Sequence, residues 1–404
     1  MNTKTTPDPP ATLGPVHDAK YATRDPARFE QIVDAPALCL SGGGYRAMLF
    51  HLGALVRLNQ LGYLPKLRRV SSVSGGSIAA GVLATAWAKL DFDAAGVAAN
   101  FDELVVSPLR SFAGRTIDVP AIVRGLLLPG SVGDRIAASY KQHLFGDRTL
   151  QDLPDDPAPS FVFNATSLQS SVLFRFSKAY LWDYRIGEVE HPSTPLAVAV
   201  AASSAFPPFL SPVTIKFAPN AFKPGSGEDL QHPPYTDRVV VSDGGVYDNL
   251  GLETAWGGFR TILVSDGGGH IGDQGSPARD WARQFYRVYG VTDNQVRSLR
   301  KHQVIGGLAS GARDGTYWGI RSHVHDFGLP DALDCPEDQT RVLAETKTRL
   351  QKMTPVLQER LINWGYAICD TAMRRHVVSG APPPAFPYPG GVAPPASAGQ
   401  ERGR

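Results

Sequence analysis

The chain has 404 residues, of which 43% are hydrophobic and 19% are charged, and its formal net charge is +2. This composition predicts a globular protein with a large core. The near-neutral charge argues against nucleic-acid binding and against long-range attraction to anionic membranes. Three cysteines, Cys39, Cys335 and Cys369, are too few and too scattered for a disulfide framework or a zinc site. We therefore expect neither a metal nor another cofactor.

The two ends of the chain differ in composition from its centre. Residues 1–35 are polar and proline-rich, and we expect a mobile leader there. No apolar segment follows Met1, and no run approaches the roughly 18 apolar residues that a membrane span needs. These features predict a cytoplasmic protein that contacts membrane surfaces only transiently. Residues 379–404 are rich in Pro, Gly and Ala, which predicts a disordered tail.

Short apolar runs followed by glycine turns indicate the fold class. Residues 37–40 and 69–73 are predicted strands. Each runs into a glycine-bearing turn that opens a helical pattern, over residues 45–61 and 75–90. Strand, turn and helix repeated in this order are typical of an α/β protein with a parallel sheet covered by helices.

The rest of the chain extends this organisation. Two more buried strands are predicted at residues 239–242 and 261–265, and each runs into Asp-Gly-Gly. We expect a catalytic domain over residues 36–337, in which the apolar residues 125–130 form a buried turn rather than a lipid-facing lid. Helices at residues 338–378 carry a leucine stripe that would pack on the core or on a partner.

The second glycine turn carries a candidate nucleophile. It reads Ser72-Val73-Ser74-Gly75-Gly76 and joins a predicted strand to a helix of small residues. Such an elbow exposes a serine hydroxyl to a base and to the positive end of the following helix. The usual spacing is Gly-x-Ser-x-Gly, and Ser72 stands here in place of the first glycine. The alternative interpretation of Ser74 is a serine that caps the helix.

The first glycine turn, Gly42-Gly43-Gly44, is a candidate oxyanion hole. Consecutive glycines after a strand can present converging N–H groups without side-chain hindrance. Arg46 would hold an anionic head group, brace the loop or lie at the surface. Gly42, Gly44 and Ala47 also match the dinucleotide-binding pattern Gly-x-Gly-x-x-Ala. A dinucleotide site, however, needs an acidic residue about 20 positions later. Residues 61–69 contain only basic charges, which disfavours nucleotide binding.

A candidate base follows the predicted strand of valines. Asp243 stands where the carboxyl ends of parallel strands would meet, and a carboxylate there could take the proton of Ser74. The alternative is an aspartate that closes a turn before glycine. His270 follows the next strand and would complete a triad in the chain order Ser, Asp, His. His51 is a further candidate, on the flank of the first helix.

Four segments occur in the order typical of one known family. They are Gly42-Gly43-Gly44-Tyr45-Arg46, the elbow at Ser74, residues 201–209, and Asp243-Gly244-Gly245 followed by Asp248-Asn249-Leu250-Gly251. Together they resemble the patatin-like phospholipases over roughly residues 36–270. The resemblance implies a three-layer α/β/α fold with a mainly parallel central sheet.

The same resemblance implies an activity. It makes Ser74 the nucleophile and Asp243 the base of a dyad without a catalytic histidine, and assigns Gly42, Gly43, Gly44 and Arg46 to the oxyanion region. The expected reaction is hydrolysis of phospholipids or other acyl lipids through an acyl-enzyme, without a cofactor. Alternatives are a regulated membrane-damaging effector whose C-terminal helices bind a partner, a Ser-Asp-His esterase, and a non-catalytic lipid-binding relative. The oligomeric state stays open.

Overall fold

The computed structural model of the chain describes residues 32–118 and 131–394. The expected turn at residues 125–130 lies outside these ranges, as do most of the expected leader and the last ten residues of the expected tail. No helix within the described ranges is long and apolar enough to cross a membrane.

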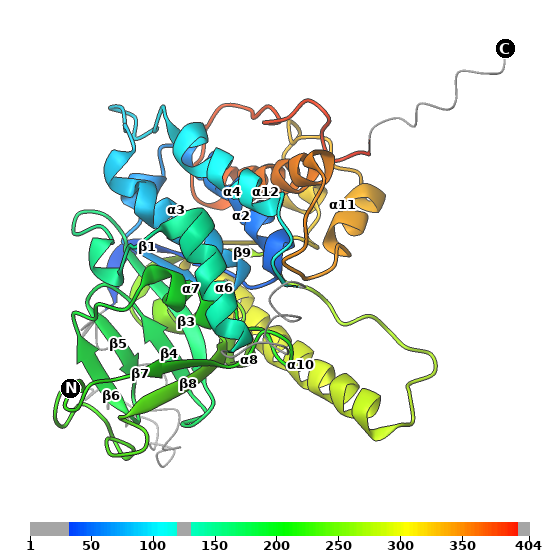
Figure 1. The fold of residues 1–404 in the computed structure, drawn as a ribbon. Coiled ribbons are helices and arrows are strands. Elements are labelled where there is room, and N and C mark those ends of the chain that lie inside the picture. Colours follow the sequence, from blue (N-terminus) through cyan, green and yellow to red (C-terminus); the bar gives the residue numbers. More distant parts are fainter. Residues whose placement is uncertain (1–31, 119–130, 395–404) are drawn as a thin grey trace, which may run out of the picture.

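One large sheet runs through the molecule (Figure 1). Its parallel half has the order β10-β9-β1-β2-β3. These strands are β1 (Val33–Leu40), β2 (Arg69–Ser72), β3 (Ser160–Ser167), β9 (Phe259–Asp266) and β10 (Asp314–Gly319). The predicted parallel sheet is thus confirmed for this half. β1 begins at Val33, inside the segment expected as leader, because Val33 donates its N–H to the Gly258 carbonyl oxygen.

The other half of the sheet is antiparallel. β4, β5 and β6 continue from β3 as a meander, while β8 pairs with β3 and with β7. These strands are β4 (Leu173–Phe176), β5 (Tyr180–Asp183), β6 (Gly187–Glu190), β7 (Val213–Lys216) and β8 (Arg238–Asp243). The α/β class is confirmed, with a sheet that is parallel only in part.

Helices cover both faces of the sheet and make three layers. They are α2 (Gly44–Gln60), α3 (Gly75–Ala86), α4 (Ser107–Ala113), α6 (Val132–Tyr140), α7 (Leu196–Ser203), α8 (Gly245–Asp248), α9 (Glu253–Trp256), α10 (Trp281–Ala309), α11 (Glu337–Ala344) and α12 (Pro355–His376). Short 3₁₀ and π turns join them, at Leu64–Lys66, Trp87–Lys89, Asp102–Val106, Lys141–Phe145, Leu150–Asp152 and Val324–Phe327.

Successive side chains of β1 point to opposite faces of the sheet, so they belong to two separate hydrophobic cores. Leu38 and Leu40 belong to the larger core beneath α2, α3 and α12. Ala37 and Cys39 belong to a smaller core that includes Val304 of α10. A strand that is buried on both faces has a continuous run of apolar residues in its sequence. This is why the strand at residues 37–40 could be predicted.

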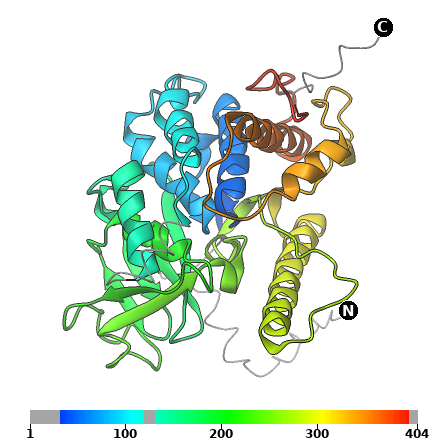
Figure 2. The same cartoon turned by 45° about the vertical axis from the view of Figure 1, so that its right-hand side comes forward.

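The C-terminal helix α12 packs along α2, so the helices expected at residues 338–378 cover the core in this structure (Figure 2). The two helices approach at two glycines. A Cβ atom built on Gly53 would lie 1.9 Å from the Ile362 carbonyl oxygen, and one on Gly365 would lie 1.8 Å from the Phe50 carbonyl oxygen. Only a glycine at each crossing lets the backbones meet so closely.

The structure describes residues 379–394 of the segment expected to be disordered, and they contact α12. Asn363 of α12 donates its side-chain N–H groups to the carbonyl oxygens of Tyr388 and Gly391, both at 2.8 Å. Val392 is buried, and its carbonyl oxygen accepts a bond from Arg360. Composition alone predicted disorder because it does not reveal polar side chains on α12 that bind the backbone of residues 379–394.

Candidate active site

Ser74 occupies a sharp turn between β2 and α3. Its backbone angles are φ 52° and ψ −118°, a region that non-glycine residues rarely adopt. Its N–H donates to the carbonyl oxygen and the hydroxyl of Ser203, at 3.2 and 3.1 Å. The Ser74 side chain makes no capping hydrogen bond to α3. A strained serine held by a neighbouring helix end fits a nucleophile better than a helix cap.

Ser72 is accommodated in place of the usual glycine. It is fully buried in β2 and accepts a hydrogen bond from the Ser77 hydroxyl at 2.9 Å. Its own hydroxyl donates to the Val162 carbonyl oxygen at 3.2 Å. Ser72 therefore satisfies its hydroxyl within the fold, and the turn at Ser74 forms with serine in place of the first glycine.

Asp243 is the last residue of β8, and the carboxyl end of β8 faces the carboxyl end of β2. Both strands lie on the same edge of β3, because Ser72 pairs with Phe163 and Asp243 pairs with Ala165, while β4 occupies the opposite edge. The sequence interpretation placed Asp243 at the end of a parallel strand, and this was wrong: β8 is antiparallel to β3. The two carboxyl ends of β2 and β8 therefore point at each other.

The Asp243 carboxyl group is buried and only partly satisfied. Oδ1 accepts the N–H of Gly245 at 2.7 Å, the turn contact expected of an aspartate before glycine. Oδ2 is buried without a well-formed hydrogen bond in the described residues. Burial raises the pKa of Asp243 to about 6, although the N–H of Gly245 and the nearby hydroxyl of Ser74 oppose the shift. One carboxylate oxygen thus closes the turn, and the other is not used by the described fold.

The glycine loop lies against the elbow. Gly43 and Gly44 have φ values of 146° and 59°, which L-side chains rarely adopt. A Cβ atom on Gly75 would lie 2.2 Å from the Gly44 carbonyl oxygen. Gly42 donates its N–H to the Asn249 carbonyl oxygen at 3.0 Å. Among the described residues, the N–H groups of Gly43 and Gly44 have no acceptor, and both glycines line the cavity.

Arg46 braces this loop from behind. It is buried and donates to the carbonyl oxygen of Gly267 at 3.1 and 3.2 Å and to that of Thr346 at 2.6 Å. Neither Arg46 nor Gly42 lines the cavity that contains Ser74. The bracing interpretation of Arg46 is therefore favoured over the two alternatives, a head-group ligand and a surface arginine.

Neither candidate histidine lines the Ser74 cavity. His51 is buried in α2, with Nδ1 2.8 Å from the Ser265 hydroxyl and Nε2 2.9 Å from the Ser41 carbonyl oxygen. Burial lowers the pKa of His51 to about 4. His270 is exposed and borders a separate cavity. Of the three residues of the candidate triad, Ser74 and Asp243 line this cavity in the described part of the chain and His270 does not.

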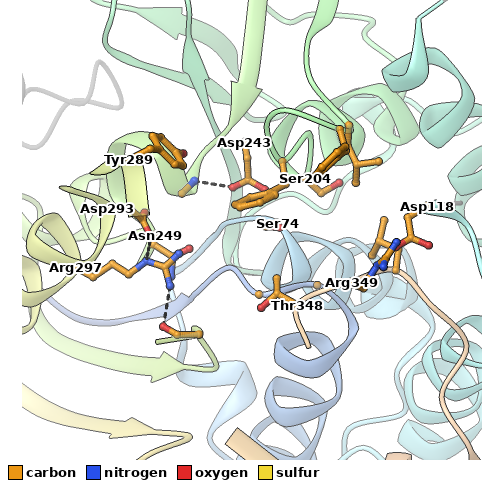
Figure 3. A pocket seen from close by; sticks show the side chains of 18 of the residues that line it. Ser74, Asp118, Ser204, Asp243, Asn249, Tyr289, Asp293, Arg297, Thr348 and Arg349 are labelled. Carbon is orange, nitrogen blue, oxygen red and sulfur yellow. Dashed lines mark hydrogen bonds and ion pairs between the residues drawn. The ribbon is translucent and has the colours of Figure 1, made fainter. Parts of the chain in front are cut away.

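Ser74 and Asp243 lie together in a cavity of about 480 Å³ (Figure 3). Much of its wall is apolar or aromatic, formed by Phe206, Phe209, Leu210, Tyr286, Tyr289 and Leu350. Two cations stand on opposite sides of the dyad. Arg297 is bonded to the Gly269 carbonyl oxygen and paired with Asp293, and Arg349 is paired with Asp118.

The sequence analysis missed the contribution of α10 and of the segment before α12. Tyr286, Tyr289, Asp293 and Arg297 all line the cavity from α10. Their spacing of three, four and four residues is that of one helix face, and this was the available signal. The segment at residues 348–350 carries no comparable pattern.

A comparison with family models covers the segment that carries Ser74 and Asp243. Residues 38–256, more than half of the chain, match the family model described as patatin-like phospholipase. That match ends before α10, so it covers only part of the cavity wall. No curated protein matches the chain.

Solved structures show a distant likeness. A human GIVD cytosolic phospholipase A2 in complex with methyl gamma-linolenyl fluorophosphonate shares 15% identity at a TM-score of 0.49, covering 84% of this chain and 58% of that one. VipD from Legionella pneumophila shares 13% identity at a TM-score of 0.36, covering 85% and 67%. The type III effector protein ExoU shares 14% identity at a TM-score of 0.28, covering 85% and 54%.

Proposed function

Since the chain belongs to the patatin-like phospholipase family, we propose that it hydrolyses acyl esters of lipids, with Ser74 as nucleophile and Asp243 as its base. One observation carries this proposal. A strained serine and a buried carboxylate with an unsatisfied oxygen lie in the same cavity, at the meeting point of β2 and β8. Neither feature contributes to the stability of the fold, since backbone strain and an unsatisfied buried oxygen are both unfavourable.

The reaction follows from this geometry. The Ser74 hydroxyl attacks the ester carbonyl carbon while Oδ2 of Asp243 accepts its proton. The tetrahedral intermediate collapses by breaking the bond to the alcohol oxygen, which takes the proton back from Asp243. Asp243 then removes a proton from the attacking water. Collapse of the second tetrahedral intermediate breaks the bond to Oγ of Ser74, which takes that proton back from Asp243 as the fatty acid is released.

The glycine loop supplies the electrostatic part of catalysis. The N–H groups of Gly43 and Gly44 would donate to the oxyanion of each tetrahedral intermediate, since neither is used within the described fold. Loss of one such donor typically costs about 3 kcal/mol of transition-state stabilisation. Arg46 would support the loop from outside the cavity, since it bonds to the carbonyl oxygens of Gly267 and Thr346 and does not line the cavity.

The cavity wall supports an acyl lipid as substrate. Aromatic and aliphatic side chains such as Phe206, Leu210 and Tyr289 would surround an acyl chain beside Ser74. Arg349 stands at the same cavity, 45% exposed, where a phosphate could contact it. These features favour a phospholipid over a small soluble ester.

Hydrolysis of p-nitrophenyl butyrate and of phosphatidylcholine vesicles tests the dyad. We expect Ser74→Ala and Asp243→Asn each to lose roughly 10³-fold or more in rate while remaining folded by circular dichroism. A fluorophosphonate probe should label the wild-type chain and not Ser74→Ala. Ser160→Ala, at the exposed start of β3, is the matched control and should keep full activity.

Two outcomes would contradict the proposal. Hydrolysis that survives in either dyad variant would show that another residue carries the reaction. A comparable loss in His270→Ala would favour the Ser-Asp-His alternative, whereas the dyad predicts that this exposed histidine can be replaced without effect.

A further inference from the structure

Helix α10 has an unusual distribution of apolar side chains. It is 29 residues long, its N-terminal end points away from the body of the molecule, and Val304 is the one buried side chain among its described residues (Figures 1 and 2). Trp281 is 83% exposed and Phe285 is 72% exposed, and Val288 and Val291 are exposed as well. An apolar face that is left uncovered on a protruding helix usually marks an interaction surface.

The two faces of α10 have different surroundings. Tyr286, Tyr289, Asp293 and Arg297 face the cavity that contains Ser74. Trp281, Phe285 and Val288 are spaced by four and three residues, so they form a separate stripe that lines no part of that cavity. We call Trp281, Phe285, Val288 and Val291 the outer face of α10.

The outer face lies beside the mouth of the cavity. Tyr286 lines the cavity and is 54% exposed, and Phe209 from the loop after α7 lines it and is 58% exposed. Side chains that belong both to the wall and to the surface mark an opening. The opening thus has an apolar side chain on each of two sides, Phe209 and Tyr286. Tyr286 is adjacent in α10 to Phe285 of the outer face.

We propose that the outer face of α10, together with Phe209, docks on the surface of a phospholipid bilayer and places the cavity mouth against the lipids. This inference rests on the proposed function, since it names where the substrate comes from. Trp and Phe on one side of a helix with arginines nearby are the composition of helices that lie in the membrane interface. An acyl chain could then leave the bilayer and enter the cavity without crossing water.

The charges around the outer face fit an anionic lipid surface. Arg279, Arg283 and Arg287 flank the exposed aromatic residues. Two acids lie nearby: Asp280 is paired with Arg283, and Asp273 borders the same hollow as Arg283 and Arg287. Arg287 donates to the Gly272 carbonyl oxygen. The local excess of positive charge would add attraction at short range, although the whole chain is almost neutral.

A second copy of the chain is a weaker candidate for the same face. It would cover the opening between Phe209 and Tyr286 and would block the route of the substrate to Ser74. A bilayer covers the opening as well, but it supplies the substrate. Continuity between the outer face and the cavity mouth therefore favours lipid.

Vesicle binding by the full-length chain tests the docking surface. The probe is sucrose-loaded vesicles of phosphatidylcholine and phosphatidylglycerol at about 4:1, with the Ser74→Ala change present throughout so that the lipid stays intact. Adding Trp281→Ser and Phe285→Ser should weaken co-sedimentation about tenfold or more. Val342→Ser, which removes a 54% exposed side chain from α11, is the matched control and should bind normally.

Trp281 provides a second readout. The other five tryptophans are at most partly exposed, so Trp281 should dominate any blue shift of emission on addition of vesicles. The shift should disappear in Trp281→Phe, which is expected to keep most of the binding because it retains an aromatic ring.

Catalytic assays separate the two proposals. In chains that retain Ser74, the Trp281→Ser/Phe285→Ser variant should hydrolyse vesicle lipid about tenfold more slowly and p-nitrophenyl butyrate at the wild-type rate. Unchanged vesicle binding in this variant would overturn the docking surface, as would a wild-type dimer that the substitutions convert to monomers. A wild-type chain inactive on both substrates would instead overturn the proposed function.

Discussion

Asp243 combines two opposed requirements in a single carboxyl group. In the proposed reaction it must be ionised to accept the proton of Ser74, yet burial at the end of β8 favours its neutral form. The N–H of Gly245 offsets part of this effect, and the resulting pKa of about 6 keeps the group mostly ionised at pH 7. A base with a pKa near the working pH is suited to both accepting and returning a proton.

The raised pKa of Asp243 predicts a cost in stability at neutral pH. The folded pKa of about 6 lies above the value of about 3.9 for an unfolded aspartate, so the folded state holds the proton more tightly. Stability from this group is fully present below about pH 4 and is lost as the pH rises through about 6. Asp243→Asn keeps an acceptor for Gly245 and carries no charge.

We therefore expect Asp243→Asn to be more stable than the wild-type chain at pH 8. The difference in free energy of unfolding should shrink as the pH falls through 6 and approach a constant below about pH 4. Urea denaturation at several pH values measures it. Glu103→Gln, which neutralises an exposed carboxylate, controls for charge loss. A difference that does not change with pH would mean that Asp243 ionises in the folded state as it does in the unfolded chain.

At the scale of elements, the contact between α2 and α12 decides how the glycine loop is supported. α2 starts at Gly44 and is buried through Asn59, with the sheet on one side and α12 on the other. The ion pair between Arg57 and the buried Asp370 joins the two helices near one end of the contact. A shift of α12 would therefore shift α2 and with it the oxyanion region.

Gly365→Ala should destabilise the fold by roughly 1–3 kcal/mol or more, since the added methyl group would overlap the Phe50 carbonyl oxygen. Gly306→Ala in α10 is the matched control, because a Cβ atom there would have no neighbour within 4 Å. It should leave stability unchanged or raise it by up to about 1 kcal/mol. Thermal unfolding of both variants checks the pair. If both substitutions changed the melting temperature equally, the close approach of α2 and α12 at Gly365 would not determine the stability of the fold.

The elements around Ser74 and Asp243 could be predicted because their signals are local. Each strand, turn and helix occupies a short stretch, and the glycines stand where the backbone turns sharply. The direction of β8 could not be predicted, because antiparallel and parallel strands with the same valines have the same sequence pattern. Only the pairing of Asp243 with Ala165 reveals that β8 meets β2 head-on.

The outer parts of the site were hidden for a different reason. α10 has its large apolar side chains on the exposed side and its polar cavity residues on the inner side, the reverse of an ordinary surface helix. The order of apolar and polar residues in this segment therefore did not reveal which face of the helix lines the cavity. The order of residues 379–394 was hidden as well, because it depends on Asn363 and Arg360 of α12, which are close to the tail only in the folded chain.

At the scale of the whole molecule, the segment that matches the family depends on contacts with the C-terminal part of the chain. Residues 346–353 run from α11 to α12 across the glycine loop. The Arg349 carbonyl oxygen accepts the N–H of Tyr45 at 3.1 Å, and that of Leu350 accepts the N–H of Ile117 at 2.8 Å. The first bond ties the end of the glycine loop to a segment about 300 residues later in the chain, and the second ties the segment after α4 to the same place.

This dependence predicts the outcome of truncation. A chain that ends at residue 337 would lack α11, the crossing segment and α12, and would expose the apolar residues of α2 that α12 covers, including Phe50 and Leu49. We expect it to be insoluble, since a large exposed apolar patch favours aggregation. A chain that ends at residue 378 would lose the contacts of the tail with α12, the bond from Arg57 of α2 to the Pro382 carbonyl oxygen and the contact of Arg110 with the Tyr388 ring. It should stay soluble and active with a lower melting temperature. Expression, size-exclusion chromatography and ester hydrolysis of both truncations provide the measurement. If the shorter chain were soluble and active with an altered oligomeric state, α12 would serve a partner rather than the core.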